Sequence, residues 1–157
     1  IGKKMKYVLL SLVLLGTSLP SFVSAKSETT PNRQASTFTP EQYQVDWDRI
    51  AEVVENTDMS AIMELDEEAS QVEDLQSAIN ATKSLRSAIQ KAQLITPEGK
   101  QVKLAFIAFC DDLIKMFVDI NQWKDDENLQ KEYTEKLKQH HDNMLNSLHI
   151  LKQLTEQ

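Results

Sequence analysis

Residues 26–157 contain a single glycine, Gly99, and only three prolines, and this scarcity constrains the fold more than any other feature of the sequence. β-Proteins of this size use glycine and proline repeatedly in their turns, so the chain is expected to consist of helices joined by short polar loops. The same scarcity excludes glycine-rich phosphate loops, the dinucleotide-binding fingerprint and the Gly-x-Ser-x-Gly nucleophile turn.

Four helix starts can be recognised along the chain. Residues 39–41 and 96–98 both read Thr-Pro-Glu, in which threonine can cap free amides, proline suits the first helical position and glutamate favours the positive end of the helix dipole. Residues 70–73 have the form of a capping box, and the acids at 125–127 offer another cap. Each start precedes apolar residues at steps of three and four, the period of an amphipathic helix.

These patterns predict four helices of similar length, at 40–68, 71–95, 98–123 and 126–155. Short loops make consecutive helices antiparallel, so the expected fold is all-α, an up-down-up-down four-helix bundle. The weak helix formers at 56–58 allow a short or kinked first helix. An alternative division runs one helix unbroken from Asp58 to Ile95.

Residues 1–25 have the features of a secretory signal peptide. Lysines precede an apolar run at 7–15, and the segment ends in a small-x-small pattern at 23–25. A bilayer span needs about 20 apolar residues, so the run is too short for a membrane anchor. We therefore expect cleavage after Ala25, a periplasmic or secreted protein and no stable membrane insertion after cleavage. Residues 26–38 are predicted to be a flexible polar leader, and 39–157 a single helical domain.

The chain is acidic, and its charge is uneven. Residues 26–157 carry 14 basic and 24 acidic side chains, a balance of −10. Residues 41–76 hold twelve acids and one base, Arg49, whereas residues 77–157 hold eleven of each. Such a chain should repel nucleic acid and anionic lipid. Although an acidic face can serve solubility alone, this one also suits a basic protein partner. The partner-binding candidates are Glu64, Asp66, Glu67, Glu68, Glu73 and Asp74.

Cys110 is the only cysteine, and its place on an apolar stripe indicates a buried thiol rather than a disulfide between chains. His140 falls on the apolar stripe of the last helix, with His141 at its edge. Folding the last two helices back about Lys124 brings Cys110 level with His140, which makes this pair a weak metal-site candidate. No histidine follows a glutamate by three residues, as a di-iron bundle requires.

Seven aromatic residues lie on the apolar stripes and are expected in the core. For Trp123, at a helix end, the alternative is a half-exposed side chain that is available to a partner. The aromatic residues are Tyr43, Trp47, Phe106, Phe109, Phe117, Trp123 and Tyr133.

The sequence thus favours an exported, non-enzymatic helical bundle that binds a basic protein through an acidic surface, without a cofactor. The alternative is a bundle that binds a metal, or haem, through His140 together with Cys110 or with Met59 or Met63 of the first helix. A third possibility is a structural bundle that self-associates through an apolar stripe.

Overall fold

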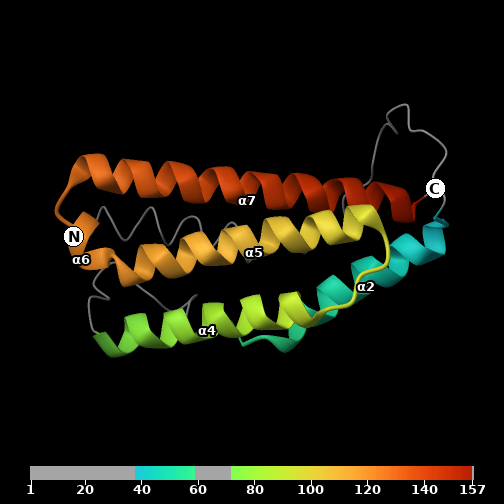
Figure 1. The fold of residues 1–157 in the computed structure, drawn as a ribbon, viewed down its shortest axis with the longest axis horizontal. Helices are drawn as coiled ribbons and strands as arrows, with labels where there is room; N and C mark the ends of the chain where they lie inside the picture. Colours follow the sequence, from blue (N-terminus) through green and yellow to red (C-terminus); the bar gives the residue numbers. More distant parts are fainter. Residues whose placement is uncertain (1–37, 59–71, 157) are drawn as a thin grey trace.

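The computed structural model describes residues 38–58 and 72–156, and these residues are all-helical, without strands (Figure 1). No helix within these two ranges is long and apolar enough to cross a lipid bilayer. The helices are α2 (Pro40–Asn56), α4 (Val72–Lys91), α5 (Pro97–Val118), the short α6 (Ile120–Trp123) and α7 (Glu127–Thr155).

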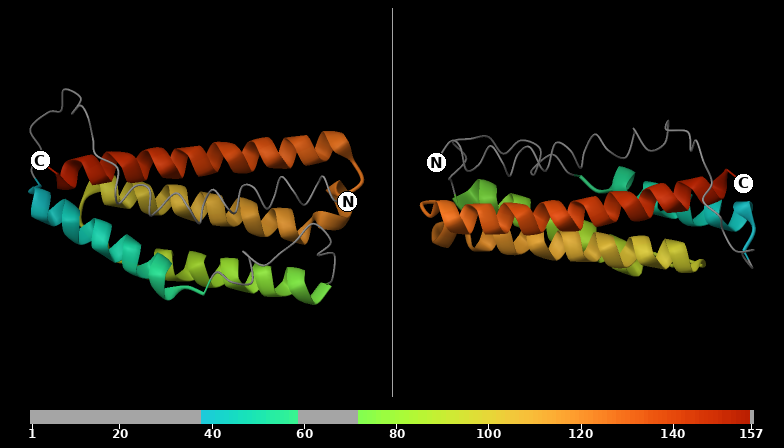
Figure 2. Two further views of the ribbon diagram at one scale, coloured as in Figure 1. Left: turned by 180° about the vertical axis from the view of Figure 1, so that it is seen from behind. Right: turned by 90° about the horizontal axis from the view of Figure 1, so that it is seen from above.

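The helices form a four-helix bundle whose longest members, α5 and α7, lie antiparallel along each other (Figure 1). α4 packs along α5 over the half of this pair near α6, and α2 packs chiefly against α7 over the opposite half (Figures 1 and 2). α2 and α4 meet where their carboxyl-terminal halves overlap. The predicted all-α, antiparallel four-helix bundle is confirmed, and the end of α2 at Asn56 fits the alternative of a short first helix rather than the favoured helix at 40–68.

The helix caps that lie in the described residues follow the sequence signals. The Thr39 hydroxyl accepts a hydrogen bond from the Gln42 amide, and the Gln42 side chain accepts one from the Thr39 amide, which completes a capping box. Thr96 caps α5 by accepting from the Gly99 amide, and Asp126 caps α7. Pro40 and Pro97 open their helices, as predicted.

A buried carboxylate joins α2 to the start of α5. Asp46 is fully buried, and its two oxygens accept hydrogen bonds from the Ile95 amide at 2.9 Å, the Thr96 amide at 2.8 Å and the Thr96 hydroxyl at 2.6 Å. No basic side chain pairs with it in the part of the chain that the structure describes. The charge is instead compensated by these three donors at the positive end of the α5 dipole.

This carboxylate also explains where α4 ends. α4 stops at Lys91. The predicted helix at 71–95 and the alternative helix from Asp58 to Ile95 both end at Ile95, so both predictions are wrong at this end. The amides of Ile95 and Thr96 donate to Asp46 instead of continuing the helical ladder. The Lys103 ammonium donates to the Ala92 carbonyl at 2.9 Å, which satisfies one acceptor left free at the end of α4.

Two other predicted boundaries also differ. α2 ends at Asn56, where weak helix formers follow, and residues 59–68 of the predicted first helix lie outside the described residues. The third helix, predicted as 98–123, is divided at Asp119 into α5 and α6. At this break the Asp119 carboxylate accepts hydrogen bonds from the Lys115 ammonium and the Tyr133 hydroxyl, both at 2.8 Å.

The core is built from the predicted apolar stripes of α2, α4, α5 and α7. Six of the seven stripe aromatics are buried, and Tyr133 is half-buried against them. The alternative of a half-exposed Trp123 is wrong, because its side chain is only 2% exposed and its indole Nε1 donates to the Met116 carbonyl at 2.8 Å. The break after Val118 lets the indole return to the end of α5, where it lies between the Met116 carbonyl and the ring of Tyr133.

Replacement of Asp46 should weaken the whole fold. We expect Asp46→Asn to lower the free energy of unfolding by about 1–3 kcal/mol, because an amide cannot accept all three hydrogen bonds and a buried donor loses its partner. Urea unfolding at neutral pH measures this. Asp48→Asn, one half-turn away and exposed, is the matched control and should change stability by less than about 0.5 kcal/mol. Equal effects of the two substitutions would contradict the role given to Asp46.

Gly99 should be required by the same contact. A Cβ atom at this position would lie 2.2 Å from Asp46 Oδ2 and 3.0 Å from Thr96 Oγ1. Alanine normally stabilises a helix by roughly 1 kcal/mol relative to glycine. Here we expect Gly99→Ala to destabilise the protein by about 1–3 kcal/mol, because the held carboxylate cannot move away. In an Asp46→Ala background the same change should be neutral or stabilising, which a double-mutant cycle measures.

Candidate functional site

The six acids proposed from the sequence are not placed by the structure. Glu64, Asp66, Glu67 and Glu68 lie outside the described residues. Glu73 and Asp74 lie in the first turn of α4, and the structure describes their backbone only. Their role in binding stays a prediction.

A second acidic surface from the same charge-rich segment is fully described, on α2. Four exposed carboxylates recur at intervals of seven, four and three residues, so they share one side of the helix. The buried residues Tyr43, Trp47 and Ile50 lie on the opposite side, against the core. We call this surface the α2 acidic face; it consists of Glu41, Asp48, Glu52 and Glu55.

The α2 acidic face is not neutralised by other parts of the described chain. None of its four carboxylates pairs with a basic side chain of residues 38–58 or 75–156. Asp48 accepts only a hydrogen bond from Gln44, at 2.8 Å. Arg49 is the one base of α2, and its guanidinium donates to the Gln93 carbonyl at the end of α4. The face extends over about 21 Å of helix, from Glu41 to Glu55.

Three acids at residues 111–119 are different, because each has a partner. Asp111 pairs with Arg86 of α4, Asp112 with His140 of α7, and Asp119 with Lys115. The hydrogen bond from Lys115, and then the one from Tyr133, lowers the pKa of the Asp119 carboxyl. These three carboxylates are therefore compensated by neighbouring side chains, whereas the four carboxylates of the α2 acidic face are not.

The spacing of these four acids was available in the sequence. Once Tyr43, Trp47 and Ile50 are assigned to the core, Glu41, Asp48, Glu52 and Glu55 fall on the opposite side of the helix. The sequence-based prediction emphasised residues 64–74 because they carry the densest acids, and so it missed the face that the helix presents.

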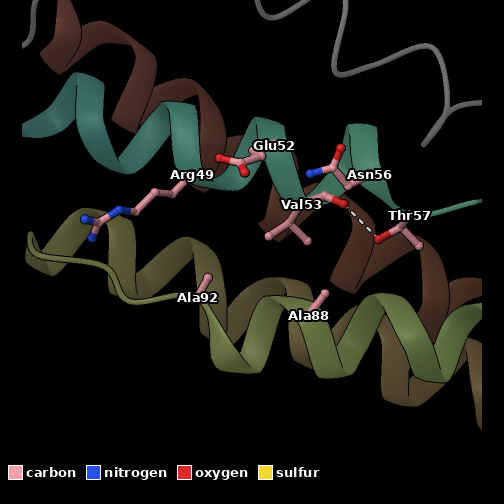
Figure 3. A pocket seen from close by; sticks show the side chains of 7 residues that line it. All are labelled: Arg49, Glu52, Val53, Asn56, Thr57, Ala88 and Ala92. Carbon is pink, nitrogen blue, oxygen red and sulfur yellow. Dashed lines mark hydrogen bonds between the residues drawn. The ribbon is translucent and has the colours of Figure 1, made fainter.

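A groove of about 330 Å³ runs between α2 and α4, next to the α2 acidic face (Figure 3). Val53 points from α2 toward α4, and Ala88 and Ala92 point back from α4 toward α2. Glu52 and Asn56 stand along the α2 edge. We call this the α2–α4 groove; it is lined by Arg49, Glu52, Val53, Asn56, Thr57, Ala88 and Ala92.

The adjacent histidines of α7 are the reverse of the prediction, which put His140 on the apolar stripe and His141 at its edge. His141 is the buried one, at 4% exposed, and its ring lies against that of Phe109 with 5.5 Å between centroids. His140 is half-buried, and its Nδ1 bonds to the Asp112 carboxylate. His141 follows Leu137 by four residues and precedes Met144 by three. By spacing alone, His141 and His140 therefore fit the apolar stripe equally well.

Cys110 is fully buried, as predicted, and burial followed by the nearby Asp111 charge raises the pKa of its thiol to about 12. The predicted alignment of α5 with α7, in which Cys110 lies level with His140, is nearly right. His140 bonds to Asp112, two residues further along α5. In the described ranges no three residues of the types His, Cys, Asp and Glu are arranged to hold a metal ion. Met59 and Met63 lie outside those ranges.

Comparison with protein families, with curated proteins and with solved structures gave no match for this chain. The function must therefore be argued from the described surface and its chemistry.

The buried His141 should make stability depend on pH. Its Nε2 has no hydrogen-bond partner among the described residues, and desolvation lowers the pKa of the imidazole below 6.5, although the nearby Asp142 opposes this shift. The unfolded chain therefore binds the proton first, so stability is complete above about pH 6.5 and falls as the pH decreases. Urea midpoints at about pH 7.5 and 5.5 should show this loss. His141→Leu should reduce it, whereas His149→Gln should not.

Proposed function

We propose that this is an exported, non-enzymatic bundle that binds a basic segment of another protein through the α2 acidic face. The observation that carries the proposal is that Glu41, Asp48, Glu52 and Glu55 share one exposed side of a helix whose opposite side is anchored in the core. A rigid helix presents these charges at fixed spacing without ordering a loop.

Electrostatics makes a basic partner the suitable one. Carboxylates on a common helix face repel each other, and a row of lysines or arginines would relieve that repulsion. Exposed charge pairs are screened by salt over about 10 Å at 0.1 M, so the binding should weaken as salt rises. The predicted acids of residues 64–74 belong to the same acidic segment of the sequence, and their part in binding is proposed from the sequence alone. Export rests on the signal-like residues 1–25 and is part of the proposal.

Neutralising the α2 acidic face should remove the binding. The variant Asp48→Asn, Glu52→Gln, Glu55→Gln keeps Glu41, which supports the amino-terminal end of α2. The probe is a labelled helical peptide of about 16 residues with lysines along one side, matched to the length of the face, and its binding is measured by fluorescence anisotropy. We expect the wild-type Kd to rise at least about tenfold between roughly 25 and 200 mM salt. At low salt, the variant should bind at least about fivefold more weakly.

The control carries the same change in net charge elsewhere. Glu132→Gln, Glu135→Gln, Glu156→Gln removes three exposed acids from the α7 part of the chain. This control should bind the peptide within about twofold of wild type. If both triple variants lose affinity equally, the attraction is due to net charge alone, and the proposal for α2 is wrong.

A further inference from the structure

We propose that the α2–α4 groove receives an apolar side chain of the same partner, so that the partner is a basic helix carrying one apolar anchor residue. This inference rests on the proposed function and specifies its ligand further. Basic side chains would lie over the α2 acidic face while the anchor enters the groove beside them.

The groove has the size and lining for one large side chain. Its volume of about 330 Å³ lies at the lower end of the range for ligand sites and is enough for one large side chain. Its floor consists of Val53, Ala88 and Ala92, which offer apolar atoms without polar groups of their own (Figure 3). The two alanines keep the groove open, since longer side chains at these positions would fill the space between the helices.

The groove and the α2 acidic face are continuous. Glu52 belongs to both, because it stands on the edge of the groove and forms part of the row of carboxylates. Val45, 38% exposed, lies seven residues before Glu52 on the same side of α2 and adds apolar surface between the acids. A partner with basic residues on one side and an apolar residue at their border would meet both surfaces at once.

The charges also decide between possible occupants. A second copy of this chain bound symmetrically through the same face would bring its own α2 acids against Glu52 and Glu55, and like charges at short distance oppose such an interface. Arg49 forms no ion pair with these acids within the described residues, and its single charge offsets only part of theirs. The uncompensated carboxylates therefore favour a cationic partner, and amphipathic helices commonly bind grooves through apolar anchors at helical spacing.

Two peptides test this inference with the unaltered protein. Both carry the lysine row used above, and one residue at its border is phenylalanine in the first peptide and alanine in the second. We expect the phenylalanine peptide to bind at least about fivefold more tightly, because burial of an aromatic side chain is strongly favourable. This preference should persist at higher salt, although both affinities fall, because apolar burial is not screened.

A groove-filling variant locates the effect. Ala88→Leu should remove the preference for phenylalanine and leave the affinity for the alanine peptide within about twofold. Gln90→Leu adds the same side chain at an exposed position of α4 and should keep the preference. Urea unfolding of both variants verifies that the bundle is intact.

The outcomes separate the two proposals. Equal binding of the two peptides, with the dependence on the α2 acids retained, would overturn the groove inference and leave the proposed function standing. A phenylalanine preference that survives Ala88→Leu would place the anchor elsewhere and also overturn it. If the wild-type protein shows no preference for phenylalanine and sedimentation shows that it dimerises at the assay concentrations, the groove is assigned to a second copy. This outcome would also overturn the inference. Failure of both peptides to bind would overturn the proposed function itself.

Discussion

The buried Asp46 carboxylate is the interaction on which the rest of the structure depends. It joins the middle of α2 to the connection between α4 and α5, two parts of the chain separated by about 50 residues. Three donors of that connection satisfy it, and Gly99 leaves the space that it occupies. Because α2 packs mainly against α7, this contact also fixes α2 relative to α4, and thereby sets the α2–α4 groove and the direction of the α2 acidic face.

Acidic residues serve two different purposes in the bundle. On α5 they connect helices: Asp111 reaches Arg86 of α4, and Asp112 reaches His140 of α7. Apart from Asp46, the acids of α2 form the α2 acidic face, which points away from the core and has no basic partner in the described residues. Exposed pairs of the first kind contribute little to stability, on the order of 0–1 kcal/mol each. Asp48, Glu52 and Glu55 form no such pair in the described residues, and this supports a role in recognition rather than in folding.

Sequence reasoning succeeded where local physics dominates and failed where the decisive contact is distant. Thr39, Pro40, Thr96 and Pro97 mark helix starts by themselves, and the periodic aromatics identified the core. The end of α4 was not predictable, because the competing hydrogen-bond acceptor is Asp46 of another helix. His140 and His141 fit the apolar stripe equally well by spacing, and the choice between them depends on Asp112 across the interface. The α2 acidic face was predictable in principle; the groove beside it was not.

The two tryptophans lie at opposite ends of the bundle, and each contacts α7. The Lys152 ammonium lies over the ring of Trp47 in α2, 5.3 Å from the ring centroid. The ring centroids of Trp123 in α6 and Tyr133 in α7 are 6.2 Å apart. These contacts are separated along α7 by 19 residues, or about 28 Å. Each half of the bundle therefore contains one tryptophan, whose fluorescence reports on that half. Single-tryptophan versions would reveal whether the half held by Asp46 and the half closed by α6 melt together or one after the other.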